Sequence, residues 1–426
     1  MSEPIRCVAK PVEERKTIKV GSGCGIPEEI LNDVDLNRRI HEELPGNYNF
    51  ELPKVVWRIR SVAASRVALQ FPEGLFIFST VISSIIEQFT GAIVLIIGDV
   101  TYGACCVDDY LTSLAQCQLL VHFGHSCLLP PNSILDGIRV MYVNVEVCFD
   151  YWHFIETFKL NFDSIKERKI AFCATVQFIS SIQKVSRELN DQGYQTMVPQ
   201  VRPLSRGEVL GCTAPSLDHD THCVVFVADG RFHLEAVMIA NPWMETFYRY
   251  NPYDKQFTRE FYDFEGMIQQ RIKAIDKARH AVKRNGTFAF VLGTLGRQGS
   301  PRVLNNLIRT FEEKAPNCNY LTFLIPEIKP SMLKEFRDTV DVWVQTSCPR
   351  LSVDWGDEFF QYPLLNPYEF QLMIKYLDEP EIDRKIFLSK LTDNREELSY
   401  PTDFYSSSSA GNWTPIHRCN KTCSCK

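Results

Sequence analysis

The chain has 426 residues, of which 45% are hydrophobic and 23% are charged, and its net charge is −6. This composition is that of a globular protein and excludes the collagen-like and disordered classes. The negative charge provides no broad basic face, so direct binding of nucleic acid is not expected. The length leaves room for about three domains of roughly 150 residues each.

The first residues lack the basic-then-apolar order of a secretory signal. The most apolar stretch, Leu75–Val100, is interrupted by Glu87, Gln88 and Gly91, so it is too short to span a membrane. We therefore expect a soluble, cytoplasmic protein without membrane contacts. In a reducing compartment its 15 cysteines serve as buried apolar side chains, such as Cys173, or as metal ligands and catalytic thiols rather than as disulfides.

The amino-terminal third predicts an arm followed by one regular unit. Residues 1–34 contain prolines and mixed charges with little periodicity, which is typical of a flexible arm. A short helix within residues 35–43 ends at Pro45. The unit that follows has a strand at 67–71, an apolar helix over 75–88 and a second, buried strand over 93–97.

The same strand–helix–strand order returns twice. The second unit has strands at 169–172 and 195–198 around a helix over 176–193. The third begins with a strand at 288–292 and a helix that Ser300 can cap, with Pro301 in its first turn. Its further strands lie at 321–325 and 340–344. The pattern predicts an α/β fold of three related domains, with these parts: domains over 35–160, 161–260 and 287–400, a linking helix over 261–286 and a loose tail over 401–426.

Each unit leads to a cysteine that follows a strand: Cys105, Cys212 and Cys348. Ligands bind beyond the carboxyl ends of parallel strands, so one thiolate from each domain could meet the other two. Three thiolates suit a zinc ion with an open position, or an iron–sulfur cluster with one iron left without a protein ligand. The alternative is three unconnected, partly buried thiols. Cys106 competes with Cys105, because adjacent side chains point to different sides.

Two further segments carry candidate chemistry. The tail has a C-x3-C-x-C spacing, formed by Cys419, Cys423 and Cys425. This spacing is one residue short of the C-x3-C-x2-C motif of ordinary radical enzymes that use S-adenosylmethionine. We expect a disordered tail or an adventitious metal site there. The glycine-rich turn 293–299 lacks both the dinucleotide spacing and the P-loop lysine. A helix amino terminus beside Arg297 would nevertheless hold a carboxylate, the alternative being a tight turn with a surface arginine.

Histidines also follow predicted strands. His122 and His125 come after the strand at 119–121, and His233 lies in the segment 229–233 after the strand at 224–227. A zinc hydrolase could use such residues as ligands or bases, but we expect them to be structural.

Seven motifs together resemble the radical enzymes of diphthamide synthesis, in the form of their eukaryotic first subunit. They are Gln70–Leu75, Gly98–Asp109, Val121–Cys127, Gly211–Thr213, Asp229–Glu235, Gly293–Pro301 and Cys348–Gly356. The resemblance spans about residues 35 to 415, so the tail cysteines lie outside it.

The resemblance implies three related α/β domains in a pseudo-threefold triangle, each giving one cysteine to a central 4Fe-4S cluster. The implied ligands are Cys105, Cys212 and Cys348, with Cys105 favoured over Cys106. The implied activity is that of a transferase. It cleaves S-adenosylmethionine (SAM) reductively and transfers a 3-amino-3-carboxypropyl radical to a histidine of elongation factor two, the first step of diphthamide biosynthesis.

The resemblance also implies a heterodimer with the related second subunit and a small iron- or zinc-binding electron donor. From charge and position we expect the SAM carboxylate to be bound by Arg350 and by Arg297 with the amides of Gln298 and Gly299. Two other classes of function are kept as alternatives. One is a non-catalytic partner subunit whose cysteines only stabilise a dimer, and the other is a zinc-dependent hydrolase that uses His122 or His125.

Overall fold

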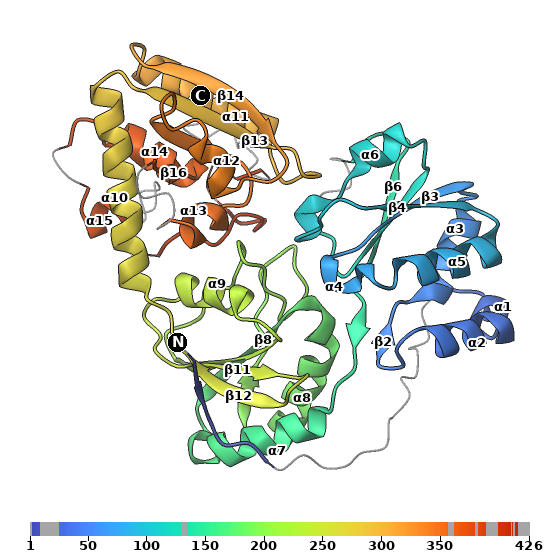
Figure 1. Cartoon of the computed structure of the whole chain (residues 1–426). Coiled ribbons are helices and arrows are strands. Elements are labelled where there is room, and N and C mark those ends of the chain that lie inside the picture. Colours follow the sequence, from blue (N-terminus) through green and yellow to red (C-terminus); the bar gives the residue numbers. More distant parts are fainter. Residues whose placement is uncertain are drawn as a thin grey trace.

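The computed structural model describes residues 2–8, 25–129, 134–356, 362–379, 382–388, 399–409, 411 and 414–415. These residues form three α/β domains placed at the corners of a triangle (Figure 1). In each domain four parallel strands lie in the spatial order second, first, third, fourth. Because the same order recurs three times, the prediction of three related α/β domains is confirmed.

The first domain carries helices on its sheet β4-β3-β5-β6. Helix α5 packs on strand β4 and against helices α2 and α3, and the apolar faces of these elements form one core. The helix predicted over 75–88 is divided into α4 and α5. The elements are α1 (Glu28–Leu31), α2 (Val34–Glu43), β2 (Tyr48–Asn49), α3 (Leu52–Ser61), β3 (Arg66–Gln70), α4 (Glu73–Phe76), α5 (Ser79–Thr90), β4 (Ile93–Ile97), α6 (Asp109–Leu114), β5 (Leu119–Phe123), β6 (Arg139–Val143) and β7 (Glu146–Val147).

The second domain extends its four parallel strands by two antiparallel ones, in the order β9-β8-β10-β11-β12-β1. The added edge strand β1 comes from the predicted flexible arm, so part of that arm is a strand. The elements are β1 (Ser2–Pro4), α7 (Tyr151–Phe162), β8 (Lys169–Ala174), α8 (Ile179–Asp191), β9 (Gln195–Met197), β10 (Thr221–Val227), α9 (Phe232–Ala240), β11 (Phe247–Asn251) and β12 (Gln256–Glu260).

The third domain has the parallel sheet β14-β13-β15-β16. Its first helix, α11, begins as predicted: Ser300 accepts a hydrogen bond from the Val303 amide, and Pro301 stands in the first turn. The elements are α10 (Phe264–Lys283), β13 (Thr287–Gly293), α11 (Pro301–Lys314), β14 (Asn319–Ile325), α12 (Pro330–Lys334), β15 (Val342–Gln345), α13 (Arg350–Asp354), β16 (Leu364–Leu365), α14 (Pro367–Lys375) and α15 (Arg384–Leu388).

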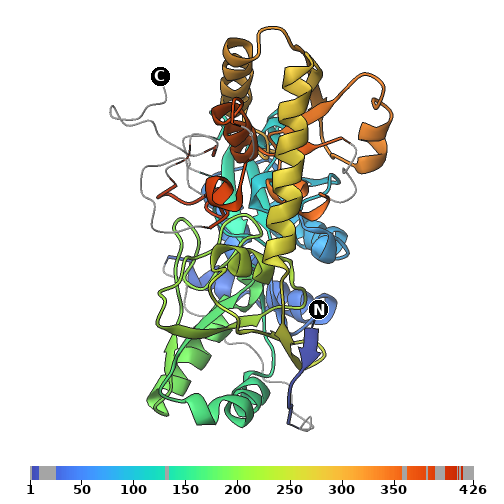
Figure 2. The same cartoon turned by 90° about the vertical axis from the view of Figure 1, so that its left-hand side faces the viewer.

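Three segments pack in parts of the fold that differ from those to which the predicted boundaries assign them. Helix α7, predicted in the first domain, buries Phe154 and Phe158 in the core of the second. Helix α10, predicted as a linker, rises along the outside of the molecule and packs against α14 of the third domain (Figures 1 and 2). Residues 401–409, predicted as a loose tail, bury Phe404 and Tyr405. In each case apolar side chains find a core that the local sequence does not reveal.

No helix in the described ranges has the length and apolar character needed to cross a membrane. The eleven cysteines within those ranges are all free thiols, and Cys173 lies in the core of the second domain as predicted. The cysteines Cys419, Cys423 and Cys425 of the predicted tail lie outside the described residues.

Candidate functional site

Thiols from all three domains lie within electrostatic reach of one another. The pKa of the Tyr405 hydroxyl is raised well above its usual value by burial and by the negative charges of Cys105, Cys106, Cys212 and Cys348. Burial, together with the charge of Cys348, raises the pKa of Cys212 to about 12. Burial likewise raises the pKa of Cys348 to about 11. The structure therefore brings together the three cysteines that the sequence singled out.

Cys105 and Cys106 lie in a short 3-10 turn, Ala104–Cys106, beyond the carboxyl end of β4. Their Sγ atoms are 4.0 Å apart. The side chain of Cys106 is fully buried, whereas Cys105 is partly exposed. The pKa of Cys105 is raised well above that of a free thiol by its hydrogen bond with Cys106, by burial and by the charges of Cys106, Cys212 and Cys348.

Cys212 lies in a tight turn that the backbone closes on itself. The Leu210 amide donates to the Thr213 carbonyl at 2.9 Å, and the Thr213 amide donates back to the Leu210 carbonyl at 3.2 Å. A Cβ at Gly211 would lie 2.2 Å from the Phe232 ring, so a larger residue at this position would have to displace that ring. The Phe404 amide donates to the Cys212 carbonyl at 3.2 Å, so the chain beyond 400 holds the turn from outside.

Buried glutamines support two of the cysteine loops. Gln70 ends strand β3 and donates from Nε2 to the Cys106 carbonyl at 2.7 Å. Gln345 ends strand β15 and donates from Nε2 to the Cys348 carbonyl at 2.9 Å. Both side chains are buried among apolar residues, where an amide has to find hydrogen-bond partners. Sequence reasoning missed this pair, although a glutamine closing an otherwise apolar strand occurs in both segments and could have indicated it.

The cysteines do not occupy equivalent places in the three repeats. Cys105 and Cys212 follow the second strand of their domains, β4 and β9, whereas Cys348 follows the third strand, β15. All three still lie at the carboxyl ends of parallel strands, where open α/β sheets bind ligands.

Arg297 joins the third domain to the first. Its guanidinium donates from Nε to Asp109 Oδ1 at 2.6 Å and also bonds Oδ2, while it lies 4.0 Å from the centre of the Tyr110 ring. The Arg297 amide donates to the Cys105 carbonyl at 3.0 Å. Burial alone would raise the pKa of Asp109, but the hydrogen bond from Arg297 holds it below its usual value. The arginine predicted to bind a carboxylate of SAM therefore already binds one in the protein.

The neighbouring amides are engaged as well. The Gln298 amide donates to the Leu295 carbonyl at 3.1 Å, and the Gly299 amide donates to the Gly293 carbonyl at 3.1 Å. The sequence led us to expect these amides to be free at the amino terminus of α11. Instead they close the glycine-rich turn on itself, so this geometry offers no open amide at either position for a SAM carboxylate.

Arg350 joins the third domain to the second. It donates to the carbonyl of Gly211 at 3.3 Å and to that of Phe232 at 3.1 Å, and it pairs with Glu235 and Asp354, both at 2.8 Å. The buried guanidinium is thus neutralised within the chain, and it contacts the turn that carries Cys212.

Gly296 fits where no other residue would. Its φ is +52°, and a Cβ there would lie 2.3 Å from the carbonyl oxygen of Cys106. The glycine-rich turn 293–299 is therefore shaped to dock on the cysteine loop of the first domain rather than to cradle a nucleotide.

We expect Gly296→Ala to destabilise the protein by about 2 kcal/mol or more, because it adds left-handed backbone strain to a steric overlap. Urea unfolding measures this change. Gly98→Ala is the matched control, since a Cβ there meets no atom within 4 Å, and we expect a change within about 0.5 kcal/mol. Equal effects of the two substitutions would contradict the docking role of Gly296.

His122 and His125 are hydrogen-bonded to each other. Nδ1 of the buried His122 is 2.8 Å from Oε1 of Gln70, and its Nε2 is 3.0 Å from Nδ1 of His125. Over the parts of the chain that the structure describes, no group of three or more His, Cys, Asp or Glu side chains is arranged to hold a single metal ion. Each of these histidines therefore has a hydrogen-bond partner within the protein.

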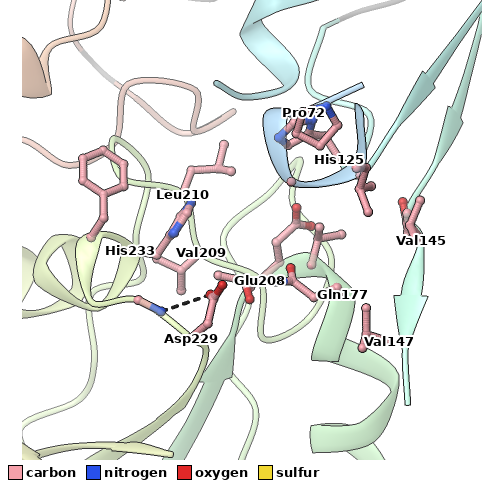
Figure 3. A pocket seen from close by; sticks show the side chains of 18 of the residues that line it. Pro72, His125, Val145, Val147, Gln177, Glu208, Val209, Leu210, Asp229 and His233 are labelled. Carbon is pink, nitrogen blue, oxygen red and sulfur yellow. Dashed lines mark hydrogen bonds between the residues drawn. The ribbon is translucent and has the colours of Figure 1, made fainter. Parts of the chain in front are cut away.

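A pocket of about 400 Å³ opens between the first and second domains and is called the interdomain pocket below. Its polar wall includes His125, Glu208, Asp229 and His233, which Figure 3 shows around one space. Tyr102 and Leu210, which precede Cys105 and Cys212 by a few residues, also line it. Glu208 ties the two domains together by accepting a hydrogen bond from Ser126 at 2.7 Å. The pocket thus adjoins two of the cysteine loops.

Comparison with known proteins gives consistent matches. The model of the family of diphthamide synthesis proteins matches residues 71–385. The chain is 47% identical to 2-(3-amino-3-carboxypropyl)histidine synthase subunit 1 of Nematostella vectensis, over 93% of this chain and 78% of that protein. It is 45% identical to the protein of the same name from Gallus gallus, over 92% of this chain and 88% of that protein. The fold is similar to a crystal structure of Dph2 from Pyrococcus horikoshii with a 4Fe-4S cluster. That match has a TM-score of 0.62 and 23% identity and covers 79% of this chain and 93% of the other.

Proposed function

The chain belongs to the family of diphthamide synthesis proteins, and from this premise we propose that it transfers a 3-amino-3-carboxypropyl group. The donor is SAM and the acceptor is a histidine of elongation factor two. The observation that carries the proposal is the convergence of Cys105, Cys212 and Cys348 from three domains on one partly buried space.

The donor set suits a 4Fe-4S cluster. Thiols with raised pKa values are neutral on their own at pH 7, and they become thiolate ligands when a cationic group compensates their charge. The three cysteines are not arranged around a single ion. A cluster of four irons binds its thiolates on different iron atoms and therefore holds them farther apart. We propose Cys105, Cys212 and Cys348 as its ligands, which leaves one iron without a protein ligand.

When bound, such a cluster supplies the electron that breaks a carbon–sulfur bond of SAM. The task of the chain is then to orient the co-substrate and to exclude water. The buried glutamines Gln70 and Gln345 fix the loops of the first and third domains. Arg297 and Arg350 join the third domain to the first and second domains.

The role of the two arginines in SAM binding stays a prediction. For Arg297 to bind the carboxylate of SAM, it would have to share or release Asp109. The same condition holds for Arg350 with Glu235 and Asp354. We propose that these guanidiniums act on SAM from the edge of the site, with Gln298 and Gly299 shaping the turn beside them.

For Arg297→Ala we expect SAM to bind roughly tenfold more weakly while the iron content stays unchanged, since one charge-assisted hydrogen bond to the co-substrate is lost. Isothermal titration of SAM measures the first quantity, and iron analysis measures the second. Arg38→Ala, which removes an exposed surface charge, is the control. An unchanged SAM affinity would remove Arg297 from the binding site and leave it only the contact with Asp109.

The family also suggests partners. The relatives are named subunit 1, and we propose a heterodimer with the related second subunit, with a small metal-binding protein as electron donor and the cytoplasm as the location. The direct test is an anaerobic assay with SAM labelled in its carboxyl carbon. The complex is expected to label elongation factor two, and a substrate with its target histidine replaced is not. Failure of the reduced complex to label the wild-type factor would contradict the proposal.

A further inference from the structure

The interdomain pocket has a composition that selects its ligand. Among the residues that line it, no lysine or arginine is present, whereas Glu208 and Asp229 are. The aromatic rings of Tyr48, Phe232 and Tyr253 form part of its wall. A pocket of this kind favours a planar ring that carries N–H donors over a carboxylate or a phosphate.

A chain of hydrogen bonds fixes the protonation of the histidine in its wall. Gln70 donates from Nε2 to the Cys106 carbonyl, so its Oε1 must accept, and Nδ1 of His122 is protonated. Nε2 of a neutral His122 is then an acceptor, and it takes its hydrogen bond from Nδ1 of His125 at 3.0 Å. The His125 ring also donates a hydrogen bond to the Phe123 carbonyl. In a neutral His125 that carries its proton on Nδ1, Nε2 is an unprotonated acceptor.

Both imidazoles in the relay are neutral. Burial lowers the pKa of His122 well below its usual value. Burial and the nearby His233 lower that of His125 to about 4. His125 lines the pocket (Figure 3), so it presents a lone pair rather than a positive charge. Thr175 is a further polar residue of the wall, and within the described residues its buried hydroxyl has no hydrogen-bond partner.

We propose that the interdomain pocket receives the imidazole ring of the histidine to be modified, and that Nε2 of His125 accepts the hydrogen bond from its N–H. This inference rests on the proposed function and adds the place where the acceptor binds. The relay from His125 through His122 and Gln70 ends on the carbonyl of Cys106. A ring held by His125 is therefore positioned by the same loop that carries the cysteines.

A binding experiment tests the pocket without any cofactor. The full chain, labelled at the Cε1 carbons of its nine histidines, is titrated with N-acetyl-L-histidinamide and followed by NMR, with His125 assigned from His125→Gln. The His125 resonance is expected to shift saturably, and N-acetyl-L-glutaminamide is expected to leave it unchanged. A saturable shift with adenosine but not with histidinamide would assign the pocket to the co-substrate and overturn the proposal.

Kinetics of the reconstituted complex test the contact. His125→Phe keeps a ring but removes the acceptor, and it is expected to raise the KM for elongation factor two about tenfold, with SAM affinity unchanged. His125→Gln, whose Oε1 can accept, is expected to recover most of the loss. His280→Gln, at an exposed position of α10, is the control. An unchanged KM in His125→Phe would overturn the proposal. A wild-type complex without any transfer would contradict the proposed function, and the histidinamide titration would still decide the pocket.

Discussion

Cys105→Ser, Cys212→Ser and Cys348→Ser are each expected to abolish aminocarboxypropyl transfer. Replacing a residue that only orients a metal ligand typically costs 10- to 100-fold, so we expect the loss of a ligand itself to exceed about a hundredfold. The physical reason is that the three thiols lie close together, since Cys212 and Cys348 raise the pKa of Cys105 and Cys348 raises the pKa of Cys212. The measurement is the labelling of elongation factor two, together with the iron content of each variant.

Two further cysteine variants make this prediction specific. Cys127 is exposed, and its thiol donates to the Leu129 carbonyl rather than to another cysteine, so Cys127→Ser is expected to retain full activity. Cys106→Ser distinguishes the adjacent thiols, and iron is expected to be retained if Cys105 is the ligand. Full transfer activity after any one of the three serine substitutions at 105, 212 or 348 would contradict a shared cluster.

Glu369→Ala is expected to destabilise the protein by about 3–5 kcal/mol, because it leaves a buried charge unpaired. Arg271 on α10 donates to both carboxylate oxygens of Glu369 on α14, at 2.6 and 2.7 Å, and both side chains are buried. Tyr400 and the Asn366 amide also donate to this carboxylate, at 2.9 and 3.0 Å. The substitution therefore leaves a buried guanidinium and two further donors without their acceptor. Urea unfolding of the full chain measures the effect.

The exposed pair Arg38–Asp35 is the matched control, with an N–O distance of 2.8 Å and more than half of each side chain exposed. Arg38→Ala is expected to change stability by less than about 1 kcal/mol. A loss of less than about 1 kcal/mol in Glu369→Ala as well would contradict the view that this pair anchors α10 to the third domain.

The repeated strand–helix–strand pattern was sufficient to predict the three domains. Buried strands such as 67–71 and 288–292 are mostly apolar, whereas the helix that follows each of them has apolar residues on one face only. Local periodicity therefore predicts the strands and helices of each domain. Domain boundaries were less accurate. Helices α7 and α10 have apolar residues whose partners are distant in the sequence, and only the packed structure shows which core they join.

The cysteines could be selected from the sequence because each follows a strand, and their convergence is a property of the assembled domains. The roles of the arginines could not be predicted in the same way. The sequence shows Arg297 beside a helix terminus, but its partner Asp109 lies 188 residues away in the chain. Tyr405 was missed for a related reason. It stands in a polar, serine-rich segment, and no local pattern indicates that it is buried beside four cysteines.

The central claim, that three cysteines of this chain hold a 4Fe-4S cluster, is tested most directly by metal and sulfide analysis after anaerobic purification with the partner subunit. The account predicts a brown protein with about four iron and four sulfide per cluster-binding chain, lost in Cys212→Ser. A colourless wild-type protein with stoichiometric zinc and no sulfide would contradict it.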